Sequence, residues 1–196
     1  MLTTSWPCLA RPWSGHFVSD LVAGLAARGH EVEVVALRWR DDALMGAEGV
    51  DVYAAELDAP HQPLVSVPLL WPLALGALAA RAQSLPTPSG ARVWLANWWP
   101  TSLAAPPDAA CVAVLHGSDV DLAERWPPAF VDGLAHRVSG AVGVAEHVAD
   151  RFSRCADVPI LGVCPLGASS ATDAGAAIPQ PWSGWAQDRR PKVLTV

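Results

Sequence analysis

The chain has 196 residues and a formal net charge of −6, with Lys192 as its single lysine. This length suits one α/β domain with a full core and is short for two, and the lack of a basic face argues against nucleic-acid binding. The four cysteines show no paired metal-type spacing, which favours a reducing compartment. No positively charged segment precedes an apolar stretch at the start of the sequence, so we see no signal peptide and expect a cytoplasmic location.

The first forty residues predict a β-loop-α-β unit. Residues 1–5 have the character of the tail of a first strand, which is short for a central position in a sheet. A loop rich in Trp, Pro and Gly then leads to a helix from about residue 16. Apolar side chains recur in this helix at every fourth residue from Phe17, which predicts a buried stripe. A second strand is expected over residues 31–37.

An uncharged apolar stretch over residues 59–80 follows a short predicted strand at 49–56. Its densest part, residues 67–80, is shorter than the roughly 20 residues that cross a bilayer and contains two prolines. We therefore expect a buried or interfacial helix that ends near Gln83. Weak contact with a membrane surface stays open as an alternative.

The rest of the chain continues to alternate between strands and helices. The run at residues 111–115 is apolar on both faces, which is typical of a buried parallel strand. Helices are expected from residue 129, with Phe130 in the buried stripe, and over 146–154. The remaining predicted strands cover 91–96, 140–144 and 159–164. This alternation predicts an α/β fold with a Rossmann-like, doubly wound, mainly parallel sheet.

The composition changes near residue 165. We expect one Rossmann-like domain over residues 1–165, followed by a Pro-, Gly- and Ser-rich linker over 166–191. Residues 192–196 have the character of the first strand of a further, carboxyl-terminal domain. The alternative is that they form an extra edge strand of the same sheet.

Candidate site residues follow the carboxyl ends of the predicted parallel strands, where ligands bind in open α/β sheets. Gly15 begins a helix and leaves backbone N–H groups free to face an anion such as a diphosphate. The structural alternatives are an ordinary helix start at Gly15, a helix cap at Asp119 and core packing of the tryptophans. The candidate set comprises Ser14, Gly15, His16, Asn97, Trp98, Trp99, His116, Gly117, Asp119 and Glu146.

Several catalytic motifs are absent from the sequence. It contains no G-x-G-x-x-G, no G-x-x-x-x-G-K-[ST] and no G-x-S-x-G, which argues against a nicotinamide or flavin cofactor, a P-loop and a hydrolase. A metal held by His116, Asp119 and Asp121 is conceivable, but no distant ligand of matching type completes it. We therefore expect no metal and no cofactor.

Five segments in order resemble one family. They read SGHFVSDLVAGLAARGHEVEVVAL, VWLANWWPTSLAA, VAVLHGSDV, AVGVAEHVADRF and VCPLGAS. Together they resemble the amino-terminal domain of GT-B glycosyltransferases of family 4. The resemblance implies a half that mainly holds the acceptor, a carboxyl-terminal half that binds the nucleotide-sugar, and transfer between them without metal and with retention at the anomeric carbon.

The resemblance also implies roles for single residues. It places Gly15, with Ser14 and His16, toward the donor diphosphate, and His116 beside the sugar as the catalytic residue. Asp119 falls where an acceptor or sugar contact is expected. Asn97 departs from the family, because many relatives have histidine there, and the first loop has one glycine where many have two.

The predicted function follows from these roles. We expect the amino-terminal half of a retaining glycosyltransferase, inactive by itself, with a nucleotide-sugar, an acceptor hydroxyl compound and a carboxyl-terminal domain as partners. The acceptor side would include Asn97, Trp98, Trp99, Gly117 and Glu146. The alternative is a non-catalytic binding or accessory module with the same fold.

Overall fold

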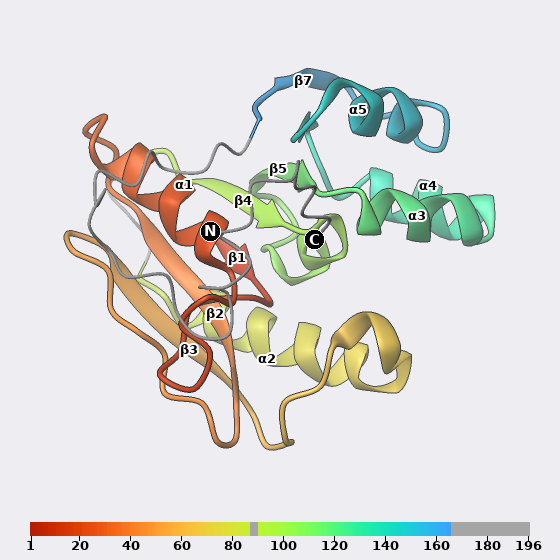
Figure 1. The fold of residues 1–196 in the computed structure, drawn as a ribbon. Coiled ribbons are helices and arrows are strands. Elements are labelled where there is room, and N and C mark those ends of the chain that lie inside the picture. The colour runs from red at the N-terminus through yellow and green to blue at the C-terminus, as the bar shows by residue number, and fades with distance from the viewer. Residues whose placement is uncertain (87–89, 166–196) are drawn as a thin grey trace, which may run out of the picture.

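A computed structural model describes residues 1–86 and 90–165 of the chain (Figure 1). These residues form a seven-stranded, all-parallel sheet with the order β3-β2-β1-β4-β5-β6-β7 and helices packed against it. The α/β, Rossmann-like prediction is therefore confirmed. The predicted linker over 166–191 and the strand over 192–196 lie outside the described residues.

The elements lie close to the predicted ranges, with shifts of a few residues at their ends. Three short 3-10 helices, named η, separate some of them. The strands are β1 Leu2–Thr3, β2 Glu33–Trp39, β3 Asp51–Leu57, β4 Val93–Asn97, β5 Ala110–Leu115, β6 Gly140–Gly143 and β7 Ile160–Val163. The helices are α1 His16–Ala26, η1 Leu64–Ser66, η2 Pro68–Leu70, α2 Trp71–Gln83, η3 Trp99–Ala104, α3 Ser118–Arg125, α4 Pro128–Ala135 and α5 Glu146–Ser153.

Strand β1 lies in the interior of the sheet, between β2 and β4, although it has only two residues. Leu2 pairs with Val35 on one side and with Ala96 on the other, and its side chain is fully buried. The expectation that this segment is too short for a central position is therefore wrong. Both neighbouring strands are longer, so they continue the sheet beyond the short central strand. The strands after β1 are added first on one side, as β2 and β3, and then on the other side, from β4 onward. This change of direction in the strand order creates a switch point between β1 and β4, where ligands bind in such folds.

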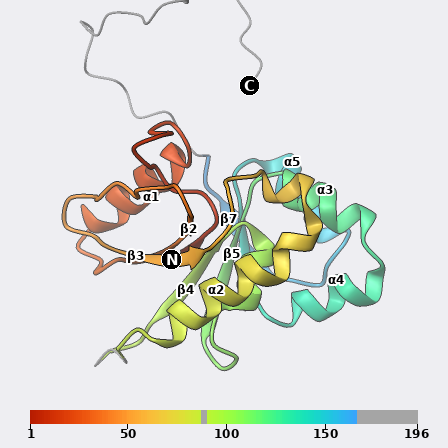
Figure 2. The same cartoon turned by 90° about the horizontal axis from the view of Figure 1, so that it is seen from below.

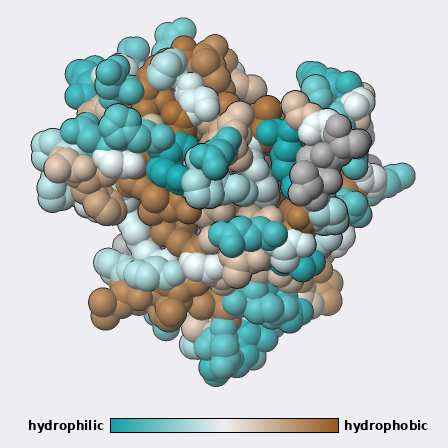
Figure 3. Space-filling view, turned by 180° about the vertical axis from the view of Figure 1, so that it is seen from behind, coloured by the Kyte–Doolittle hydropathy of each residue, from teal (hydrophilic) through white to brown (hydrophobic). Residues whose placement is uncertain are grey.

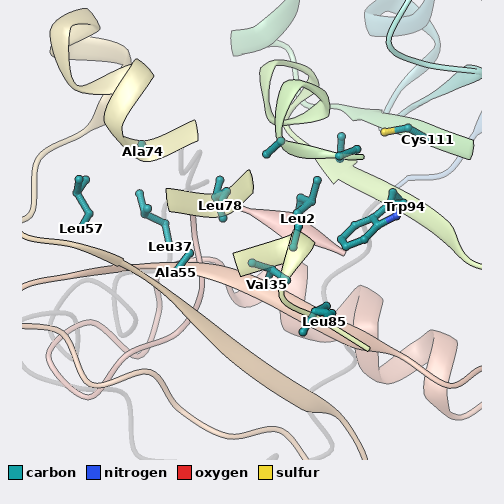
Figure 4. Close-up of a cluster of buried hydrophobic side chains, with 14 of the residues drawn as sticks. Leu2, Val35, Leu37, Ala55, Leu57, Ala74, Leu78, Leu85, Trp94 and Cys111 are labelled. Atoms are coloured by element: carbon teal, nitrogen blue, oxygen red, sulfur yellow. The ribbon is translucent and has the colours of Figure 1, made fainter. Parts of the chain in front are cut away.

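The two faces of the sheet are covered by different helices. On one face, Val18 and Val22 of α1 pack against Val34. On the other, Leu78 of α2 packs against Val35, the next residue of β2 (Figure 4). Successive side chains of a strand point to opposite faces, so α1 and α2 lie on opposite sides of the sheet, as Figures 1 and 2 also show.

Helices α3, α4 and α5 cover the same face as α2. Cys111 belongs to the core under α2, whereas Leu115 on the same side of β5 belongs to the core with Val131 of α4 and Phe152 of α5. Residues 111 and 115 share one face because side chains alternate along a strand. The loops after β4 and β5 therefore lie between the core under α2 and the core that contains α4 and α5.

Two helices leave the aromatic residue of their expected apolar stripe partly exposed. Phe17 is 39% exposed and Phe130 is 50% exposed. The buried positions are Val18 and Val22 in α1 and Val131 and Leu134 in α4. Val18, Val22 and Leu134 were expected in the apolar stripes, whereas the burial of Val131 was not predicted. The smaller side chains face the sheet or core, and the rings lie at the rim of each helix.

Candidate functional site

A cavity of about 290 Å³ opens at the carboxyl edge of the sheet, at the switch point between β1 and β4. Of the predicted site residues, Asn97, Trp98 and His116 line it. Ser5 after β1 and Ser118 at the start of α3 complete its polar wall. A cavity of this size lies at the lower end of the range for small-molecule sites, which is enough for one ring-sized unit.

A chain of hydrogen bonds fixes the orientation of His116. The hydroxyl of Thr3 donates to the carbonyl oxygen of Ser5 at 2.8 Å, so Thr3 Oγ1 accepts from Asn97 Nδ2 at 3.3 Å. The Asn97 Oδ1 atom therefore faces His116 Nε2 at 2.9 Å. Because an amide oxygen only accepts, Nε2 carries the proton of the neutral imidazole. The Nδ1 atom is then left as a hydrogen-bond acceptor and proton acceptor.

The surroundings of His116 favour this neutral form. Burial lowers the pKa of the imidazole below its ordinary value, and the nearby Asp119 carboxylate opposes the shift without cancelling it. The ring of Phe17 packs against the His116 ring with centroids 5.0 Å apart. This contact accounts for the outward position of Phe17. His116 is thus an uncharged imidazole at neutral pH, held on one side by an amide and on another by an aromatic ring.

Asp119 lies behind the cavity wall and not on its surface. The residue is fully buried. Its Oδ1 accepts from the backbone N–H groups of His116 at 2.8 Å and Val120 at 3.2 Å, and its Oδ2 accepts from the N–H of Trp99 at 3.2 Å. Burial raises the pKa of this carboxyl group while the N–H donors oppose that rise. The structure therefore gives Asp119 a positioning role, in contrast to the expected contact with an acceptor or sugar.

The tryptophans at 98 and 99 differ in position. Trp98 lines the cavity and has φ 105°, the only positive φ of a non-glycine residue in the described part of the chain. Its carbonyl oxygen accepts from the Thr101 hydroxyl at 2.8 Å, which helps to hold the strained turn. Trp99 is fully buried and its ring packs against Phe152 at 4.9 Å. Of the two tryptophans predicted to stack on a substrate, Trp98 alone therefore lines the cavity, and Trp99 is a core residue.

The loop before α1 lies next to the cavity. Gly15 has φ 66°, and a Cβ on it would stand 2.6 Å from the carbonyl oxygen of Ser5. The close packing of the first loop thus requires glycine at this position. Ser14 places its hydroxyl 3.3 Å from that of Ser5. No side chain caps α1, so its first N–H groups stay available to an anion.

Three other predicted residues do not line the cavity. His16 is 62% exposed and pairs with Asp20 within its own helix at 3.2 Å. Gly117, with φ 87°, makes the turn between His116 and α3. Glu146 begins α5 and is exposed, and it is absent from the cavity lining. The structure therefore does not bring Glu146 together with His116 in this cavity.

Sequence reasoning missed the side of the cavity that β2 and β3 supply. Trp39 ends β2, and its ring packs edge-on against His61 at 5.3 Å. His61, Gln62 and Leu64 follow β3 and also line the cavity. Burial and the Arg11 cation lower the pKa of His61. The available signal was position alone, since these residues also follow the carboxyl ends of parallel strands.

Among the residues that the structure describes, those that line the cavity include no aspartate, glutamate, lysine or arginine. The cavity can offer neutral donors and acceptors together with aromatic faces, which suits an uncharged ligand with several hydroxyl groups. Among residues 1–86 and 90–165, no group of three or more His, Cys, Asp or Glu side chains is placed to hold a metal ion. No helix in the same part of the chain is long and apolar enough to cross a membrane.

Comparison with known proteins gives no family for the chain. No family model matches its sequence, and no curated protein is significantly similar to it. The likeness of its segments to family 4 glycosyltransferases therefore enters only the proposal that follows.

Proposed function

We propose that this chain is the acceptor-side domain of a nucleotide-sugar-dependent glycosyltransferase, and that the cavity at the β1/β4 switch point holds the uncharged acceptor. The observation that carries the proposal is the fixed tautomer of His116. Its Nδ1 atom is free to accept a hydrogen bond from a hydroxyl group, and in the transfer step it could take up that proton. Asn97 would hold the imidazole, and Trp98 would give the ring of the acceptor an apolar face.

The donor would bind mainly outside this cavity. A diphosphate needs cations or several N–H donors, and the cavity lining has no cationic side chain. The uncapped start of α1 at Gly15 is the described feature that best suits a phosphate group. We therefore propose that a further domain supplies most of the donor site, without metal, and that the chain acts at the cytoplasmic side.

The test measures the binding of neutral glycosides to the 196-residue chain by saturation-transfer NMR. We expect weak binding of methyl glycosides, and His116→Ala should reduce their affinity at least about fivefold, because a lost hydrogen bond to a ligand hydroxyl is worth about 1 kcal/mol or more. His136→Ala is the matched control, because His136 is exposed and lies outside the cavity lining. Equal loss in both variants would remove His116 from the proposed site.

Nucleotide-sugars provide the second arm of the same test. We expect the isolated chain to bind UDP- and GDP-sugars weakly or not detectably and to transfer no sugar. Micromolar binding, measured by calorimetry, would contradict the assignment of the donor to another domain. If a protein that continues past Val196 also binds glycosides but transfers no sugar, the result would instead favour a non-catalytic binding module.

A further inference from the structure

A second concave surface lies on the helical side of the sheet, apart from His116. It is a groove of about 490 Å³ between α2, η3 and α4. Its walls include Trp71 and Leu75 of α2, Leu103 of η3, and Trp126 and Phe130 near α4. In the described part of the chain, every residue that lines the groove is glycine, alanine, proline, leucine, phenylalanine or tryptophan, so none of these residues presents a charged group to a ligand.

Exposed apolar side chains are found in the groove lining and next to lining residues in the sequence. Leu69 is 87% exposed and Leu73 is 59% exposed, and Phe130 is half exposed. The whole stretch from residue 59 to 80 carries no charged residue, although the chain as a whole is strongly acidic. Figure 3 shows brown apolar areas that reach the surface on the rear face of the molecule. An exposed apolar patch of this kind marks a site for an apolar partner.

The groove and the His116 cavity share a wall. Trp71 lines the groove and Trp98 lines the cavity, and their rings pack edge to face with centroids 5.0 Å apart. The segment before α2 repeats this arrangement, because Leu64 lines the cavity and Pro68 lines the groove. A cavity whose polar lining suits hydroxyl groups thus lies directly beside a groove whose lining suits only hydrocarbon.

We propose that the groove binds a single alkyl chain of a neutral amphiphile. An alkyl chain matches the lining, which lacks polar partners for a peptide backbone. The net charge of −6 disfavours an anionic lipid head group at this surface. That the amphiphile is also the sugar acceptor, with its head group in the adjoining cavity, rests on the proposed function. The binding of an alkyl chain in the groove does not rest on the proposed function.

The experiment titrates the 196-residue chain with 1-alkanols from hexanol to decanol, followed by calorimetry. Burial of a methylene group is worth about 0.8 kcal/mol, so each added carbon should tighten binding about fourfold until the groove is filled. Affinity that is independent of chain length would overturn the proposal. Because alkanols carry no sugar, this result is separate from glycoside binding in the His116 cavity, and either can fail alone.

Gly76→Leu is the variant that fills the groove. Gly76 lines it, and a Cβ at this position meets no atom within 4 Å, so the substitution is compatible with the fold of α2. Decanol affinity should fall at least about tenfold. Gly133→Leu is the matched control, since Gly133 lies on α4 with equally open space and does not line the groove. Equal affinity in Gly76→Leu and the wild type would overturn the proposal.

The molecular mass in solution tests the other occupant of an apolar surface, which is a second copy of the chain. Sedimentation should give a monomer for both glycine variants and for the wild type. A wild-type dimer that Gly76→Leu dissociates, without any binding of alkanol, would assign the groove to self-association and overturn the proposal.

Discussion

Asp119→Asn offers the sharpest test of how the site is held. The carboxylate joins two loops, because it accepts N–H groups from Trp99 after β4 and from His116 after β5. Asparagine keeps the shape but has one accepting atom. If its oxygen serves His116 and Val120, its NH₂ group faces the N–H of Trp99, and a buried donor loses its partner.

The size of the effect follows from these bonds. A buried unsatisfied donor costs about 1–3 kcal/mol, and the bonds that remain weaken because they are no longer charge-assisted. Relief from burying a charged carboxylate offsets part of this loss. We expect the free energy of unfolding to fall by about 2–4 kcal/mol, and the melting temperature by about 4–16 °C for a chain of this length.

Urea unfolding and thermal unfolding measure this change. Asp121→Asn is the matched control in the same first turn of α3, where Asp121 is 51% exposed and pairs with Arg151. It removes the same charge from the helix start but should cost less than about 1 kcal/mol. If the two variants lose equal stability, Asp119 acts only through its charge and the proposed link between the loops is wrong.

Three further substitutions test the surroundings of the cavity. Gly15→Ala should cost more than about 2 kcal/mol in urea unfolding, because its Cβ meets a backbone oxygen, whereas Gly49→Ala, with positive φ but open space, should cost about 1 kcal/mol; equal costs would remove the steric argument. Because the pKa of His116 is lowered in the folded chain, the unfolded chain binds more protons than the folded chain as the pH falls below 6.5. The contribution of His116 to the free energy of unfolding is therefore full above that pH and declines below it. His116→Gln should flatten this decline, and an unchanged pH profile would contradict the lowered pKa. Nitrogen-15 NMR should find the proton of the neutral His116 imidazole on Nε2 in the wild type, and Asn97→Leu should remove the preference for this tautomer. A proton on Nδ1 in the wild type would refute the hydrogen bond from Nε2 to Asn97 Oδ1.

Much of the fold could be predicted because apolar runs dominate the strands. The run that ends at Leu115 is apolar on both faces, so it belongs to a parallel sheet whatever its neighbours are. The chain order of strands and helices then restricts the topology to a doubly wound sheet. Strand β1 was misjudged because its two residues depend on longer neighbours, and pairing across a sheet is not visible in a local pattern.

The meeting of Asn97 and His116 at one edge of the sheet was predicted, but the direction of the neighbouring side chains was not. Loops after parallel strands meet at one edge, which is why Asn97 and His116 lie together despite 19 residues of separation. The direction of a side chain within a loop depends on tertiary contacts. Asp119 turns inward because unpaired N–H groups of a distant loop need an acceptor, and Trp99 turns inward because the strained backbone at Trp98 redirects the chain.

The neutrality of the cavity is a consequence of where the charges of this acidic chain are neutralised. Arg11 pairs with Asp42 and Arg38 with Glu56, and both pairs lie in or beside loops and strands outside the cavity lining. The one carboxylate near His116 is buried and satisfied by backbone N–H groups. If the cavity holds the proposed uncharged acceptor, its recognition relies on shape, aromatic contact and directed hydrogen bonds, which discriminate among hydroxyl compounds by geometry and not by charge.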